Sequence, residues 1–345
     1  MSTVLIVGGG LAGAAAAKEL ADSGRRVLLI EAAGELGGKV RSYGCKATDK
    51  CSNCGVCLTK NLWDHVGKSD MIKIRLSTGI ADLSGRKGNY TAALKSAGAL
   101  SYINGISDVI VATGFKKTTK ENSNSIIEMT GLSADAGRSV ILGSDIERLM
   151  KERGEARLFE KTPEKAAFIQ CYGSRDKKEN AMHCSRVCCA YSTRAAKLIK
   201  KYYPECEITF FYMEMQQVKG CNYFAQIKEL GVNFIKCWPV KIAAERRVNI
   251  FFDNPATGRR ESQEFDYVVL SDGIHPTEDA GRIAEIFGLG QTDAGFLKYV
   301  KDITDAERTG IYIAGAAKGP MKIEETYADA IAAARSILFP QRREQ

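Results

Sequence analysis

The first thirty residues limit most strongly what this chain can fold into. Residues 4–7 form a short apolar run, Gly8, Gly10 and Gly13 follow with the spacing G-x-G-x-x-G, and a second apolar strand ends at Glu31. In a Rossmann-type βαβ unit such glycines allow a tight turn, close approach of the backbone to a pyrophosphate and close helix–strand packing, while the acid accepts hydrogen bonds from the ribose. The helix N-terminus then faces the phosphates. The pattern predicts dinucleotide binding.

Later glycine turns favour FAD over NAD as that dinucleotide. Gly37 and Gly38 make a second glycine turn directly after the Glu31 strand, and segments 108–114 and 310–320 are typical of strands that end in small residues. A helix is expected over 323–338, and its N-terminal dipole would stabilise a reduced, anionic flavin. The predicted cofactor contacts are Gly8, Gly10, Leu11, Ala12, Gly13, Glu31, Ala32, Gly38, Lys39, Val40, Ala112, Thr113, Gly114, Gly315, Ala316 and Ile323.

A second βαβ unit is expected in the middle of the chain. Strands are predicted over 166–171 and 207–215, an amphipathic helix over 188–203 lies between them, and a further strand is predicted over 266–274. The 345 residues are enough for two cores. We therefore expect an α/β fold with two Rossmann-like domains of the dinucleotide-binding type. The expected FAD domain is discontinuous, 1–118 plus 278–345, and the second domain covers 119–277.

Four cysteines occur where this second unit would otherwise have its glycine-rich turn. Their spacing is C-x12-C-x3-C-C, and they are Cys171, Cys184, Cys188 and Cys189. Cys184 and Cys188 are expected one helical turn apart on one helix face. A helix dipole with Arg175 and Arg186 would offset thiolate charge. One or two of the thiols could be buried and inert, but four at such a turn favour a [4Fe–4S] centre.

A second cysteine group lies earlier in the chain, with the spacing C-x5-C-x2-C-x2-C. Its members are Cys45, Cys51, Cys54 and Cys57. This spacing is close to that of ferredoxins, but it also suits zinc, a dithiol near the flavin, or a loop of free thiols. Cys206, Cys221 and Cys237 are isolated and are interpreted as ordinary core or surface thiols.

Charge and hydropathy exclude some functions. The net charge of +8 is spread along the chain, which indicates a solvated surface or a face for an acidic redox partner more than a nucleic-acid patch. No apolar stretch is long enough for a membrane span, and no leader sequence is recognised, so we expect a cytoplasmic protein. In that compartment thiols stay reduced, so eleven cysteines indicate metal or redox chemistry rather than disulfides.

The segment FIQCYGSRD…HCSRVCC closely resembles the part of the heterodisulfide reductase HdrA family that ligates an iron–sulfur cluster through four cysteines. VGGGLAGAAAA, ELGGKV, CSNCGVC, DVIVATG and GIYIAGAAKGPMKIEET are similar to that family too, so the resemblance covers essentially the whole chain. It implies Cys171, Cys184, Cys188 and Cys189 as cluster ligands and Gly8, Gly10, Gly13 and Glu31 as FAD contacts. It also implies a homodimer with a thioredoxin-reductase-like flavoprotein fold.

The chain departs from the methanogen pattern in having no C-x2-C-x2-C-x3-C-P run and no extra N-terminal domain before the glycine fingerprint. It is most similar to the compact subunit of the heterodisulfide-reductase-like complex of sulfur-oxidising prokaryotes, which puts electron bifurcation in doubt. The resemblance implies an electron-transfer subunit that stores electrons on FAD and passes them through the cluster to B- and C-like subunits during sulfane-sulfur oxidation.

Two alternatives remain open at this point. One is an NAD(P)H-dependent flavoprotein disulfide reductase that uses a C-x2-C dithiol such as Cys54 and Cys57. The missing second glycine fingerprint argues against it. The other is a non-catalytic scaffold whose cysteines bind zinc.

Overall fold

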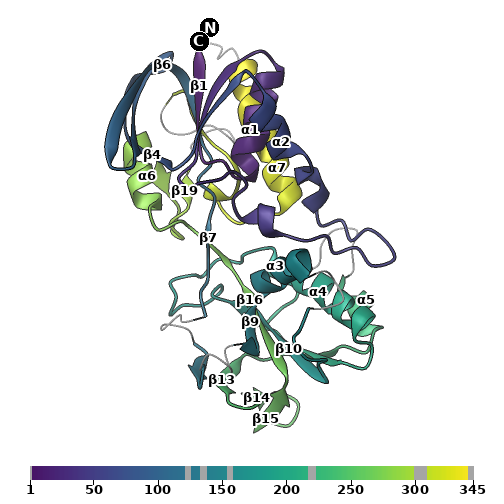
Figure 1. The fold of residues 1–345 in the computed structure, drawn as a ribbon. Helices are drawn as coiled ribbons and strands as arrows, with labels where there is room; N and C mark the ends of the chain where they lie inside the picture. The colour runs from purple at the N-terminus through teal and green to yellow at the C-terminus, as the bar shows by residue number, and fades with distance from the viewer. Residues whose placement is uncertain are drawn as a thin grey trace. The chain divides into compact units, whose positions relative to one another are not determined.

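The chain folds into two compact units, which are described separately (Figure 1). The computed structural model describes residues 2–120, 126–132, 138–153, 158–216, 223–298 and 309–340. Unit 1 contains residues 1–41, 55–116 and 275–345, and unit 2 contains residues 42–54 and 117–274. These boundaries lie within three residues of the expected 118/119 and 277/278, with one difference. Segment 42–54, expected in the FAD domain, clusters with the second unit.

Unit 1 is built on one mixed sheet. Its parallel part has the order β3 (Ile72–Arg75), β2 (Arg26–Ile30), β1 (Thr3–Val7), β6 (Ala99–Val111) and β20 (Ile311–Ile313). The long strand β6 also pairs with β5 (Asn89–Ser96), which pairs with β4 (Thr78–Arg86), both antiparallel. The helices of this unit are α1 (Leu11–Asp22), α2 (Leu62–Lys68), α6 (Ala280–Phe287) and α7 (Ile323–Leu338). The glycine turn thus lies at the centre of the sheet, between β1 and α1.

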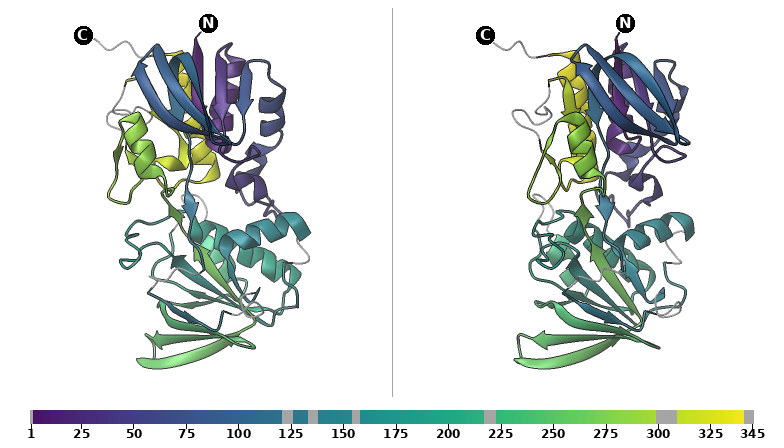
Figure 2. Two further views of the ribbon diagram at one scale, coloured as in Figure 1. Left: turned by 60° about the vertical axis from the view of Figure 1, so that its left-hand side comes forward. Right: turned by 90° about the vertical axis from the view of Figure 1, so that its left-hand side faces the viewer.

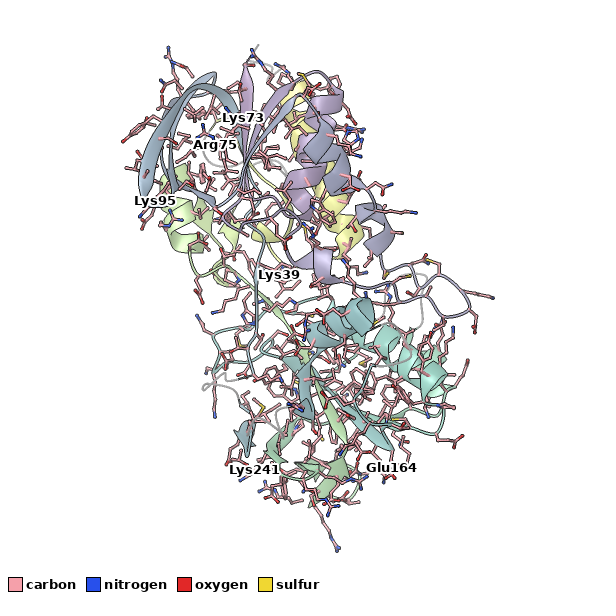
Figure 3. The ribbon with its side chains drawn as sticks, viewed as in Figure 1. Lys39, Lys73, Arg75, Lys95, Glu164 and Lys241 are labelled. Atoms are coloured by element: carbon pink, nitrogen blue, oxygen red, sulfur yellow. The ribbon has the colours of Figure 1, made fainter. Side chains whose placement is uncertain are left out.

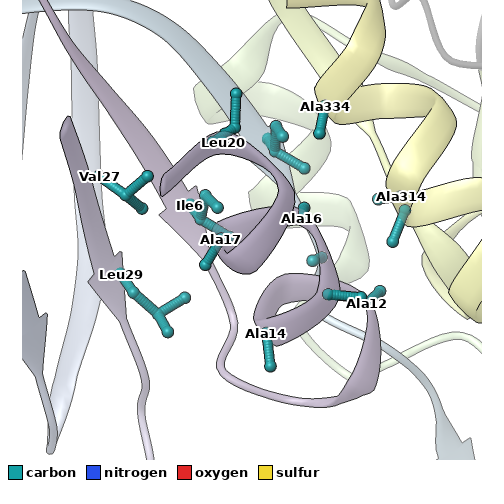
Figure 4. Close-up of a cluster of buried hydrophobic side chains, with 14 of the residues drawn as sticks. Ile6, Ala12, Ala14, Ala16, Ala17, Leu20, Val27, Leu29, Ala314 and Ala334 are labelled. Atoms are coloured by element: carbon teal, nitrogen blue, oxygen red, sulfur yellow. The ribbon is translucent and has the colours of Figure 1, made fainter. Parts of the chain in front are cut away.

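Alternate side chains of the central strands fill two separate cores. Ile6, Val27 and Leu29 pack against α1 and α7, which lie side by side (Figures 2 and 4). Leu5 and Leu28 point to the opposite face and pack against α6 and the β4–β5 hairpin. The run of alanines in α1 has no side chain longer than a methyl group, so the helix can lie close to both the sheet and α7. Burial on both faces explains why these strands are continuously apolar.

Unit 2 repeats this plan. Its parallel sheet has the order β12 (Asn233–Ile235), β11 (Glu207–Phe211), β10 (Lys165–Tyr172), β16 (Tyr267–Asp272) and β9 (Val140–Leu142). A second sheet has the order β15 (Arg259–Phe265), β14 (Val248–Asn254), β13 (Pro239–Ala244) and β8 (Glu128–Thr130). The helices are α3 (Gly143–Arg153), α4 (Cys188–Tyr202) and α5 (Tyr223–Lys228). Both units are therefore Rossmann-like, and the predicted fold class is confirmed.

The remaining elements are short. Two-residue strands pair as β7 (Lys116–Lys117) with β17 (Ile274–His275) and as β18 (Gly290–Gln291) with β19 (Leu297–Lys298), and 3-10 turns cover Lys39–Ser42, Val56–Thr59 and Gly315–Ala317. Within the described ranges, none of the helices has the length and apolarity required to cross a membrane.

Candidate functional site

The predicted cofactor residues of unit 1 gather at one end of its sheet. They follow β1, β2, β6 or β20, or they begin α1 or α7: Gly8, Gly10, Leu11, Ala12, Gly13, Glu31, Ala32, Gly38, Lys39, Val40, Ala112, Thr113, Gly114, Gly315, Ala316 and Ile323. The carboxyl ends of parallel strands are where doubly wound folds bind dinucleotides. That these residues contact FAD stays a prediction.

The first glycine turn has no room for side chains. A Cβ on Gly13 would lie 1.8 Å from the carbonyl oxygen of Gly8. Gly8 itself has φ +108°, and a Cβ there would lie 2.4 Å from the carbonyl oxygen of Ala112 at the end of β6. The backbone is therefore held between α1 and β6 with its N–H groups uncovered by side chains, as a pyrophosphate site requires.

The second glycine turn packs directly on the first. The backbone N–H of Gly37 donates to the carbonyl oxygen of Gly9 at 3.0 Å. A Cβ on Gly38 would lie 3.1 Å from the Cα of Gly10. Glu31, the acid predicted for the ribose, accepts a hydrogen bond from the backbone N–H of Gly9 at 2.6 Å. The two turns and this carboxylate form one cradle.

A third turn, after β20, completes the cradle. Gly315 has φ +70°, and a Cβ there would lie 2.7 Å from the Cβ of Ala12 in α1. Its N–H donates to the carboxylate of Asp329 at 2.7 Å, and the same carboxylate pairs at 2.5 Å with Lys318. Both side chains are buried, and burial lowers the pKa of Lys318. Three turns that exclude side chains fit a dinucleotide.

The four cysteines of unit 2 lie where the order of its strands reverses, between β10 and β16. Cys171 is in the last turn of the strand β10, and Cys188 and Cys189 are the first residues of α4. Cys171 has φ +61°, which is unusual for a residue with a side chain. A crevice of this kind is the usual ligand site of a doubly wound sheet. The cysteines therefore occupy the position of a nucleotide.

The expectation that Cys184 and Cys188 share a helix face is wrong. Helix α4 begins at Cys188, and Arg186 before it has φ +60°, so the chain is not helical between the two cysteines. Cys184 lies in the preceding loop, where its sulfur accepts a hydrogen bond from the backbone N–H of Arg186 at 3.3 Å. The turn still brings the two thiols into one neighbourhood.

The four thiols interact electrostatically. Burial raises the pKa of Cys171 to about 12, and the charges of Cys189 and Cys184 raise it further, while Arg175 lowers it. Burial also raises the pKa of Cys188 and of Cys189. The sulfur of Cys189 accepts from the backbone N–H of Gln216 at 3.4 Å. Thiolates this crowded and buried require a bound cation, which fits a soft-metal or iron–sulfur site in chemistry.

The side chains are not gathered around a single point. In the part of the chain that the structure describes, no group of three or more His, Cys, Asp or Glu side chains has metal-binding geometry. The thiol of Cys188 instead donates to the backbone carbonyl of Asp272 at 3.6 Å. A metal would have to replace this proton, because thiolates are the ligands. The cluster-ligand assignment stays a prediction.

Asp272 and Tyr191 belong to this site, although the sequence analysis did not single them out. The hydroxyl of Tyr191 donates to the carbonyl of Asp272 at 3.0 Å, and the Asp272 carboxylate accepts from the backbone N–H of Ser144 at 2.9 Å. A Cβ on Gly143 would lie 2.4 Å from the Tyr191 ring. The tyrosine thus fills the space between α3 and α4. Its place one turn after Cys188 was the available signal.

Segment 42–54 places part of the first cysteine group in unit 2. Lys46 and Glu147 of α3 form a buried ion pair. Arg194 of α4 donates to the backbone carbonyls of Ser52 and Asn53, both at 2.9 Å. The segment is therefore attached to the same helix that begins with Cys188.

The cysteines of this segment share one feature with the second group. The sulfur of Cys51 accepts from the backbone N–H of Asn53 at 3.4 Å, and Asn53 has φ +48°, as at Cys184 and Arg186. Cys45, Cys51 and Cys54 lie in unit 2, whereas Cys57 lies in unit 1. Of the isolated cysteines, Cys206 is buried, Cys237 is half-buried, and Cys221 lies outside the described residues.

Comparison with known proteins supports the dinucleotide-binding fold. Residues 6–55 match the family described as NAD(P)-binding Rossmann-like domain. The structure is similar to thioredoxin reductase of T. acidophilum, with a TM-score of 0.65 and 18% identity over 98% of both chains. It is also similar to that of Lactococcus lactis, with a TM-score of 0.63, 15% identity and 98% of both chains covered.

The similar curated proteins are the A subunits of heterodisulfide reductases, which confirms the resemblance. The A subunit of the Ferredoxin/F(420)H(2)-dependent CoB-CoM heterodisulfide reductase of Methanosarcina acetivorans is 25% identical over 97% of this chain and 52% of its own length. That of the H(2):CoB-CoM heterodisulfide,ferredoxin reductase of Methanothermobacter marburgensis is 26% identical over 97% and 63%. The corresponding protein of Methanocaldococcus jannaschii is 33% identical over 60% and 34%. This chain thus spans less than two thirds of each relative's length.

Proposed function

We propose that this chain, a relative of the A subunits of heterodisulfide reductases, is an oxidoreductase subunit that transfers electrons, with FAD in unit 1 and a [4Fe–4S] cluster in unit 2. A flavin exchanges electrons in pairs or singly, and an iron–sulfur cluster exchanges them singly. The alternative of an NAD(P)H-dependent disulfide reductase is not favoured by these relatives.

The observation that supports this proposal most directly is the content of the crevice in unit 2. A nicotinamide nucleotide would need a glycine-rich turn there, and instead Cys171, Cys188 and Cys189 line it while Tyr191 fills the space beside α3. Unit 1 keeps all three glycine turns of its own cradle. The chain therefore has one dinucleotide site and one thiol site.

The residues around each site prepare it for its cofactor. In unit 1, Glu31 is held by the backbone of the first glycine turn, in the position from which an acid contacts a ribose. In unit 2, backbone N–H groups of Arg186 and Gln216 donate to the sulfurs of Cys184 and Cys189. Such hydrogen bonds stabilise thiolates and raise the reduction potential of a bound cluster.

The finer parts of the proposal rest on the resemblance. We propose B- and C-like partner subunits, a homodimer, a cytoplasmic location and a role in sulfane-sulfur oxidation, as in the compact subunit of sulfur-oxidising prokaryotes. Cys45, Cys51, Cys54 and Cys57 remain a second candidate metal set.

Iron, acid-labile sulfide and flavin should be measured per chain in protein purified without oxygen. We expect one FAD and four irons, and Cys184→Ser should remove the iron while FAD stays bound. Cys237→Ser is the matched control, because Cys237 lies away from the site and should keep both cofactors. Retention of iron in Cys184→Ser with its loss in Cys51→Ser would move the cluster to the first group. Colourless protein containing zinc would refute the proposal.

A further inference from the structure

The twelve residues between Cys171 and Cys184 form a hairpin with an exposed basic tip. We propose that this hairpin is the docking surface for an electron-transfer protein with an acidic surface. The inference rests on the proposed function of the neighbouring cysteines, but it concerns protein binding and can be tested separately.

The hairpin is a defined structure. Asp176 and Ala181 exchange two backbone hydrogen bonds, of 3.1 and 3.0 Å. The N–H of Asn180 donates to the carbonyl of Lys177 at 3.1 Å and closes the tip, with Asn180 at φ +52°. At the base, the N–H of Arg175 donates to the carbonyl of His183 at 3.1 Å. The spacer between the two cysteines therefore has a fixed shape.

A buried carboxylate holds this shape from inside. Asp176 is 0% exposed. Its two oxygens accept from the backbone N–H of Lys178 at 2.9 Å and of Ile126 at 3.2 Å. A charged group this deeply buried persists only when it is well hydrogen-bonded. Its role is structural, and it makes the hairpin rigid before any partner binds, which lowers the entropy cost of docking.

The exposed side chains of the hairpin are basic or apolar. Lys177, Lys178 and Arg186 are exposed, and Met182 is exposed to 68%. The acids of the same stretch contribute less to its surface, since Asp176 is buried and Glu179 is half-buried. Methionine and arginine are enriched in protein interfaces. An apolar residue with cations around it matches a partner whose contact surface is acidic.

The hairpin lies beside the most accessible thiol of the site. Cys184 is half-buried, whereas Cys171, Cys188 and Cys189 are buried. Met182 is two residues from Cys184, and Arg186 binds its sulfur through the backbone. A protein seated on the hairpin would therefore be next to the one thiol that faces the surface. This position favours an electron-transfer partner over nucleic acid as the occupant.

The test compares two double variants that change the net charge equally. Lys177→Glu with Lys178→Glu alters the hairpin, and only the backbone of these residues takes part in its hydrogen bonds. Lys73→Glu with Lys95→Glu alters exposed lysines of β3 and β5 in unit 1 and serves as the control (Figure 3). The probe is an acidic plant-type [2Fe–2S] ferredoxin, and the readout is its Kd for full-length anaerobic protein at low and at high salt.

We expect wild type and control to bind the ferredoxin alike and to weaken as salt rises. The hairpin variant should bind at least about tenfold more weakly at low salt, with little salt dependence. Equal Kd values for the two double variants would overturn the inference. So would binding of a single-stranded DNA 20-mer that depends on Lys177 and Lys178 when the ferredoxin does not bind. Iron is measured on the same samples: if it is absent, the proposed cluster fails, whereas the Kd comparison still decides the docking surface.

Discussion

The buried pair of Lys46 and Glu147 allows a quantitative test of how segment 42–54 is held. The two side chains are 4% and 9% exposed, and Lys46 also donates to the carbonyl of Gly44 at 3.0 Å. Lys46→Met keeps the apolar stem of the side chain and leaves the Glu147 carboxylate buried without its cation. Removing one partner of a buried pair costs about 3–5 kcal/mol. We expect a loss of that size, up to the free energy that holds the segment in place.

The double variant Lys46→Met with Glu147→Leu should recover most of that loss, because apolar replacement of a whole buried pair is often neutral or stabilising. Urea unfolding of wild type, both single variants and the double variant gives the coupling energy, expected to be about 3 kcal/mol. Hydrogen exchange over residues 42–54 separates local detachment of the segment from global unfolding. Arg194, which binds the carbonyls of Ser52 and Asn53, should keep part of the segment in place.

The loss should also depend on pH. Burial raises the pKa of Glu147, and Lys46 opposes that rise, so removing Lys46 raises the pKa further. An acid whose folded pKa lies above its ordinary value of 4.5 contributes stability below that value, and this stability is lost as pH rises through the folded pKa. The deficit of Lys46→Met should therefore be largest at neutral pH and shrink on acidification. A deficit under about 1 kcal/mol, or one independent of pH, or a double variant as unstable as Lys46→Met, would refute the reasoning.

Three further substitutions test the packing and electrostatics of unit 1. Gly13→Ala puts a Cβ 1.8 Å from the carbonyl oxygen of Gly8, so it should cost at least about 3 kcal/mol and remove FAD, measured by thermal unfolding and flavin content. Gly67→Ala in α2 has no atom within 4 Å of its Cβ and should instead stabilise by about 0.5–1 kcal/mol, visible as a higher Tm. Burial raises the pKa of Asp108 above its usual 3.8, so wild type loses stability as pH rises through the folded pKa. Asp108→Asn should be more stable than wild type at pH 7.5 and equal near pH 3, and lower stability at pH 7.5 would contradict this.

Local patterns predicted much of the fold. Helix α7 spans Ile323–Leu338, as expected, and α1 follows its glycine turn at Leu11. These elements are decided by residues that are near one another in the sequence: the glycine spacing, the alanine run and the apolar periodicity. The strand expected over 207–215 ends at Phe211, because the apolar run continues past the last residue paired in the sheet.

The parts of the site that sequence reasoning missed depend on contacts between distant residues or on unusual backbone angles. Positive φ at Arg186 separates Cys184 from α4, and no periodicity reveals a left-handed residue that is not glycine. The attachment of segment 42–54 depends on Lys46 meeting Glu147, two residues far apart in the sequence. Asp176 resembles an ordinary loop acid until its complete burial is known.

The division of the chain between the two units has a consequence for synthesis on the ribosome. The chain passes from one unit to the other at residues 41/42, 54/55, 116/117 and 274/275. The main segment of unit 2 is therefore complete when unit 1 still lacks β20, the pairing partner of β6. The cysteines of unit 2 emerge before Gly315 can close the glycine cradle. During translation the thiol site can accept its metal first, and the nucleotide site is finished last.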